Sequence, residues 1–168
     1  MKKAVISVIL MLLGVLVFGQ NLRDYTLITN QNIEDVPNLR TTKYAIFCDG
    51  YGIRTLTTNG EKSHIYQEGN IFMSFDMTAE QERQLDSIRE SRETPLVLFT
   101  RRGTNRNNFR FVVDRFIPSE EIFGVKISEL PRSLRGREGG HNIIEILQLY
   151  LGTGRPDPDG RVARALVQ

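Results

Sequence analysis

The stretch from residue 53 to residue 75 reads IRTLTTNGEKSHIYQEGNIFMSF, and it decides the fold class. It contains three short runs, 53–58, 63–67 and 70–75, that are rich in β-branched and aromatic residues. Such runs are typical of β-strands. Asn59-Gly60 separates the first two runs, and because both residue types accept positive φ, the pair predicts a tight hairpin.

Two neighbouring segments extend this pattern. The run KYAIFCD at 43–49 precedes it across the turn residues 49–52, so we expect a four-stranded antiparallel meander. After it, Thr78 and Gln81 have the spacing of a capping box, in which each side chain satisfies a backbone N–H of the other residue. This predicts a helix at about 79–92, and its few apolar residues place it on the surface.

The second half of the chain predicts a hairpin and a buried helix. Two more strands are expected at 95–100 and 109–114, joined by a polar loop. A helix from about Asn142 to Leu151, ended by Gly152, has an apolar face wide enough for burial. We therefore predict an α+β fold: an antiparallel sheet of about six strands (meander, helix, hairpin), with the C-terminal helix packed on one face.

The N-terminus has the three regions of a secretory signal. Two lysines precede a charge-free apolar run from Ala4 to Phe18, and small residues follow. The run is shorter than the roughly 20 residues needed to span a bilayer. We expect a signal peptide at 1–19 and no membrane span after its cleavage; an uncleaved single-pass anchor is the alternative. The expected location is the periplasm or the exterior of a bacterium. The remaining chain divides into an irregular lead-in at 20–42, a domain at 43–152 and a turn-rich tail at 153–168.

Charge and cysteine content narrow the possible partners. Lys2 and Lys3 carry the whole net charge of +2, so the chain without residues 1–19 has 20 basic and 20 acidic residues. This balance argues against nucleic acid as a partner. Cys48 is the single cysteine, so no internal disulfide can form, and its apolar neighbours predict a buried, inert thiol.

The loop between the last two strands is the strongest local charge feature. Arg101, Arg102, Arg106 and Arg110 lie within ten residues with no acid between them. Guanidinium groups bind phosphate, sulfate and carboxylate bidentately, so these arginines predict a surface for an anionic glycan or an envelope protein. The alternative is a solubilising loop on an edge hairpin.

A histidine and a glutamate mark the start of the last helix. In REGGHNIIE (137–145), His141 and Glu145 are one turn apart and could pass a proton. Two residues are fewer than the three protein ligands of a catalytic zinc, and His64 lies in a distant strand. We therefore expect helix capping and a solvated polar stripe here, with no metal and no cofactor.

These features favour a binding or interaction module of the bacterial envelope. One alternative is a small secreted hydrolase that uses His141 and Glu145. Another is a subunit of a larger envelope complex, which an exposed apolar patch on the sheet would favour.

Overall fold

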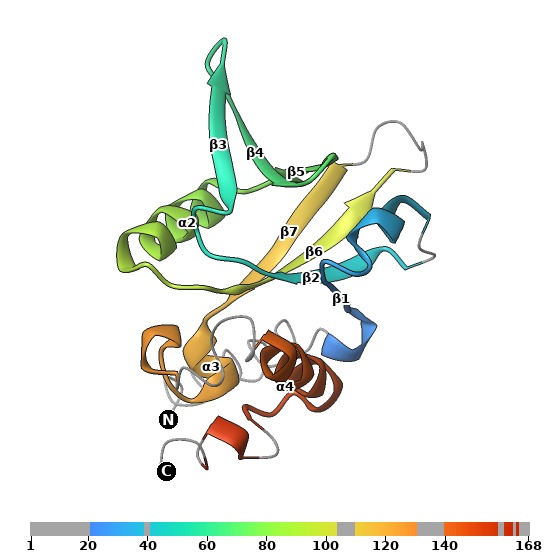
Figure 1. Cartoon of the computed structure of the whole chain (residues 1–168). Coiled ribbons are helices and arrows are strands. Elements are labelled where there is room, and N and C mark those ends of the chain that lie inside the picture. The colour runs from blue at the N-terminus through green and yellow to red at the C-terminus, as the bar shows by residue number, and fades with distance from the viewer. Residues whose placement is uncertain are drawn as a thin grey trace, which may run out of the picture.

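The structure is a computed structural model that describes residues 21–38, 41–103, 110–130, 140–157, 160–162 and 164; for 37–38 and 140–142 only the backbone is described. It contains one seven-stranded sheet in the order β1-β2-β6-β7-β5-β4-β3, with helices on both faces (Figure 1). The strands are β1 Thr26–Ile28, β2 Lys43–Phe47, β3 Ile53–Thr58, β4 Glu61–Glu68, β5 Ile71–Asp76, β6 Leu96–Arg102 and β7 Arg110–Ile117. The α-helices are α2 Ala79–Ser91, α3 Ser119–Phe123 and α4 Gly140–Thr153, and the 3-10 turns are η1 Leu22–Asp24, η2 Ile33–Asn38 and η3 Ile127–Glu129.

The α+β class is confirmed, but the prediction of a purely antiparallel sheet of about six strands is wrong. Seven strands form a mixed sheet, in which β1 pairs with β2 and β5 pairs with β7 in parallel. The additional strand, β1, comes from the segment that we expected to be irregular. It is only three residues long, and Leu27 and Ile28 are buried. A strand this short leaves almost no periodic signal in a sequence.

The predicted four-strand meander is also wrong, because β2 pairs with β6 and not with β3. Strand β2 is buried on both faces, because the exposed fractions of Tyr44, Ala45 and Ile46 are at most 3%. Such a strand takes an interior position in the sheet. In β3 only Ile53 is buried, and the strand forms the edge of the sheet. The remaining meander has three strands, β3, β4 and β5.

The local turn and cap predictions are confirmed. Asn59 and Gly60 have φ of 52° and 80°, as the two-residue hairpin requires. Thr78 and Gln81 form both hydrogen bonds of the capping box. The predicted end of the last helix is wrong: α4 continues through Gly152, and the left-handed residue is Gly154, whose N–H donates to the Tyr150 carbonyl at 2.7 Å.

Each face of the sheet carries its own core. Alternate residues of β6 point to opposite faces, so Leu96 and Leu98 pack with α3 and α4, whereas Val97 and Phe99 pack in a second cluster that includes Leu85 of α2. In that second cluster the ring centroid of Phe99 lies 4.9 Å from that of Phe75, 5.4 Å from that of Phe111 and 5.6 Å from that of Tyr44. The predicted burial of Cys48 is confirmed. In Figure 1 the hairpin of β3 and β4 projects away from α3 and α4.

Among the described residues, no helix combines the length and the apolar character that crossing a membrane requires. The expected signal at 1–19 lies outside the described residues.

Candidate functional site

Two of the four predicted arginines lie together at the base of the loop between β6 and β7. Arg102 and Arg110 are register partners, directly opposite each other, and both are exposed. Arg101 pairs with Phe111, so its side chain belongs to the opposite face of the sheet, and its N–H donates to the Thr42 carbonyl at 2.7 Å. Arg106 lies outside the described residues. The structure therefore separates Arg101 from the pair formed by Arg102 and Arg110.

This arginine pair borders a hollow of about 380 Å³. The hollow lies where β5 separates from β7, which are joined by only two register pairs. Its other lining residues are Asp76, Met77, Thr78, Gln81, Val112 and Val113. Among the described lining residues, two guanidinium groups and the Asp76 carboxylate sum to a formal charge of +1. Like charges directly opposite each other on paired strands repel, and an anion between them would relieve that repulsion.

The first turn of α2 forms the opposite wall of this hollow. Gln81 fixes the wall to β7, because its Nε2 donates to the Val113 carbonyl at 2.7 Å. The Thr78 hydroxyl accepts from the Gln81 N–H at 3.1 Å, and the Gln81 Oε1 accepts from the Thr78 N–H at 3.0 Å. These hydrogen bonds already occupy two backbone N–H donors at the start of α2, those of Thr78 and Gln81. Charge recognition in the hollow therefore depends on the arginine pair.

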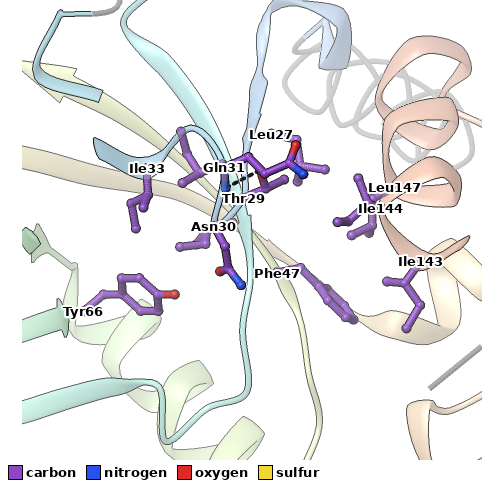
Figure 2. A pocket seen from close by; sticks show the side chains of 12 residues that line it. Leu27, Thr29, Asn30, Gln31, Ile33, Phe47, Tyr66, Ile143, Ile144 and Leu147 are labelled. Atoms are coloured by element: carbon purple, nitrogen blue, oxygen red, sulfur yellow. Dashed lines mark hydrogen bonds between the residues drawn. The ribbon is translucent and has the colours of Figure 1, made fainter. Parts of the chain in front are cut away.

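A second hollow, of about 370 Å³, is mainly apolar and lies at the ends of β1 and β2. Figure 2 shows Ile143, Ile144 and Leu147 of α4 on one side and Ile33 and Tyr66 on the other. The polar lining residues are Thr29, Asn30, Gln31 and Tyr66, and none of the twelve lining residues carries a charge at neutral pH. Burial, assisted by Glu68, raises the pKa of Tyr66 to about 12, so its hydroxyl stays protonated. This apolar hollow suits an uncharged group.

Sequence reasoning missed a buried polar network around His64. His64 is 4% exposed; its Nδ1 lies 2.9 Å from the Thr55 hydroxyl and its Nε2 lies 3.1 Å from Glu82 Oε1. Arg89 Nη2 donates to the Thr55 hydroxyl at 3.0 Å, so that hydroxyl can donate its own proton to Nδ1. The Nε2–H then donates to Glu82.

This network ties β3 and β4 to α2. The hydrogen bond from His64, with the nearby Lys62 charge, holds the pKa of Glu82 below its ordinary value. Thr55, His64 and Glu82 are residue types that hydrolases use, but both ring nitrogens and the hydroxyl are already engaged in holding the hairpin. Alternation along β4 could have placed His64 on the buried face, but its partner on α2 depends on tertiary packing.

The structure pairs Glu145 with a residue of the C-terminal segment. Arg161 Nη1 donates to the Glu145 carboxylate, and the Arg161 N–H donates to Asp157 Oδ1 at 2.9 Å, so Glu145 helps to hold the C-terminal segment against α4. His141 lies in the first turn of α4, and its side chain lies outside the described residues. Within the described ranges, no group of three His, Cys, Asp or Glu residues is placed to hold a metal ion.

Comparison of the chain with protein-family models, curated proteins and solved structures found no match. The functional argument therefore rests on the residues of this chain.

Proposed function

We propose that the protein is an exported binding module of the bacterial envelope, which holds an anionic ligand between Arg102 and Arg110. The observation that supports this function is the direct cross-strand pairing of two exposed arginines at the border of a hollow. The proposed location rests on the signal-like segment 1–19.

The arginine pair suits a planar or tetrahedral anion. Directly opposed side chains on antiparallel strands have Cβ atoms about 5 Å apart, so two guanidinium groups reach the same ligand group from both sides. Each can form two parallel hydrogen bonds to a carboxylate, sulfate or phosphate. We therefore propose a uronate- or sulfate-bearing glycan, or an acidic segment of an envelope protein, as the ligand. The formal charge of +1 in the hollow is too small for a nucleic-acid surface.

The test is calorimetric titration of the purified protein with a polyuronate oligosaccharide, a sulfated oligosaccharide and an acidic peptide. A hydrogen bond to a charged group contributes roughly 1.5–3 kcal/mol when buried. Because both arginines are exposed, we expect a loss of about tenfold in affinity for Arg102→Ala or Arg110→Ala, and a larger loss for the double variant. Asp76→Asn should strengthen binding, because it removes the only negative charge among the described residues that line the hollow.

The matched control is Arg155→Ala. Arg155 is also exposed but lies beyond α4, away from the hollow, and its removal changes the net charge equally. An affinity that the double arginine variant leaves unchanged would overturn the proposed site. An equal loss in the Arg155 variant would show that only net charge matters.

Cell fractionation tests the proposed export separately. We expect the protein outside the cytoplasm, with a first residue near Gln20 in its mass spectrum. An intact chain that retains Met1 in the cytosol would contradict the proposed location.

A further inference from the structure

In the part of the chain that the structure describes, β3 is an edge strand, and its own residues lack the usual protection against further pairing. It lies at one end of the strand order and consists of Ile53, Arg54, Leu56 and three threonines. Natural edge strands are commonly blunted by lysine, proline, a bulge or an inward-pointing charge. The one charged side chain here, Arg54, donates to Gln67 Oε1 on β4 at 2.8 Å, so its guanidinium lies across its own sheet. The strand is open to another strand of similar composition.

An apolar stripe runs to this edge across the face of the meander opposite α2. Leu56 is 49% exposed, Phe72 is 64% exposed and Ile65 is half-buried. In the register, Leu56 is opposite Ser63 and Phe72 is opposite Gln67. Ile65 lies midway between Ser63 and Gln67, so the three apolar residues form one diagonal across β3, β4 and β5. We call this diagonal the edge stripe.

We propose that two copies of the protein associate through antiparallel pairing of β3 with β3, about a two-fold axis at Leu56. Leu56 then faces Leu56 of the second copy, Thr55 faces Thr57, and Arg54 faces Thr58. No two like charges are opposed. A two-fold axis perpendicular to the sheet places the edge stripe of the second copy on the extension of the same straight line. The two edge stripes therefore join into one apolar band.

Neighbouring registers are less favourable. An axis at Thr55 places the Arg54 guanidinium opposite Leu56, and an axis at Thr57 places Leu56 opposite Thr58. Of these three registers, only the axis at Leu56 pairs an apolar side chain with an apolar side chain, an arrangement that stabilises paired strands. A self-matching register requires no other protein, which is why a second copy fits this edge.

The interface is small. Five paired residues and one apolar band bury less than the roughly 1,200 Å² of a stable interface, so the expected dimer is weak and concentration-dependent. In the sheet, β4 and β5 lie between this edge and the arginine pair, which is on β6 and β7. Ligand binding by Arg102 and dimer formation by Leu56 can therefore fail independently.

Sedimentation velocity over a micromolar to millimolar concentration series tests the dimer. Wild-type protein should self-associate, whereas Leu56→Glu and Leu56→Lys should each stay monomeric, because either change brings two like charges together at the axis. An equimolar mixture of the two variants should form a dimer that contains one of each. Association of the two variants with each other distinguishes pairing of two copies at this register from binding of a different partner to β3.

The control is Tyr51→Glu, which introduces the same charge at a large apolar side chain that is 66% exposed but lies outside β3. It should self-associate like the wild type. Circular dichroism checks that the Leu56 variants are folded, as their exposure predicts. A wild-type protein that is monomeric at every concentration, or a mixture of variants that does not associate, would overturn the proposal.

Discussion

Leu85 anchors α2 to the sheet, and its truncation is a quantitative test of the fold. It is 1% exposed and is the one fully buried side chain of this helix. Leu85→Ala removes three buried carbons, which costs about 2.4 kcal/mol at about 0.8 kcal/mol per carbon. The cavity left behind raises the expected loss of unfolding free energy to about 3 kcal/mol.

Urea denaturation followed by circular dichroism measures this loss, and thermal denaturation gives a second value. At roughly 3 °C per kcal/mol for a domain of this size, the midpoint should fall by about 9 °C. Leu56→Ala is the matched control, because the same truncation at a side chain that is 49% exposed should cost less than about 0.5 kcal/mol. Both variants are compared at low protein concentration, so that self-association does not contribute.

Similar losses in the two variants would refute the packing of α2 described above. The Leu85 variant should also bind anions more weakly. The reason is that α2 positions Thr78 and Gln81, which line the hollow bordered by Arg102 and Arg110.

Three further predictions concern other sites. Burial raises the pKa of the Cys48 thiol to about 12, so iodoacetamide should label it slowly in the native protein at about pH 8 and rapidly in urea; fast native labelling would contradict its burial. The hydrogen bond from His64 lowers the folded pKa of Glu82 below the ordinary value of 4.5, so its contribution to stability is present above that value and is lost as the pH falls through the folded pKa. The difference in unfolding free energy between wild type and Glu82→Gln should therefore shrink as the pH falls below about 4.5 and through the folded pKa, and a constant difference would argue against the pair. Ile144→Glu should reduce binding of the neutral dye Nile red by placing a charge in the apolar hollow, whereas Arg102→Ala should leave it unchanged; equal binding by the Ile144 variant would exclude this hollow as the dye site.

The sequence predicted those features that are encoded by neighbouring residues. The positive φ values at Asn59-Gly60 and the capping box of Thr78 depend on groups only a few residues apart, and both were found. The place of β2 depends on a choice between two partners, β3 and β6, that are both strand-forming. Burial on both faces decides it, and the apolar run from Tyr44 to Cys48 indicates that burial but does not identify the partner strand.

The candidate site also has features that the sequence predicted and features that it did not. Arg102 and Arg110 were predicted because they belong to one charged loop, but their facing register depends on how β6 and β7 pair. The partners of His64 and Glu145 come from segments distant in the sequence, Glu82 and Arg161. Contacts of this kind have no spacing that a single sequence can show.

The strand order also determines when this protein can fold during its synthesis. β2 lacks its antiparallel neighbour until β6 has left the ribosome, and β5 lacks its neighbour until β7 has done so. A nascent chain that ends near Ser91 therefore exposes two incomplete sheet fragments, each with an open apolar edge. The later hairpin joins them, so the sheet cannot be completed until the residues up to Ile117 have emerged.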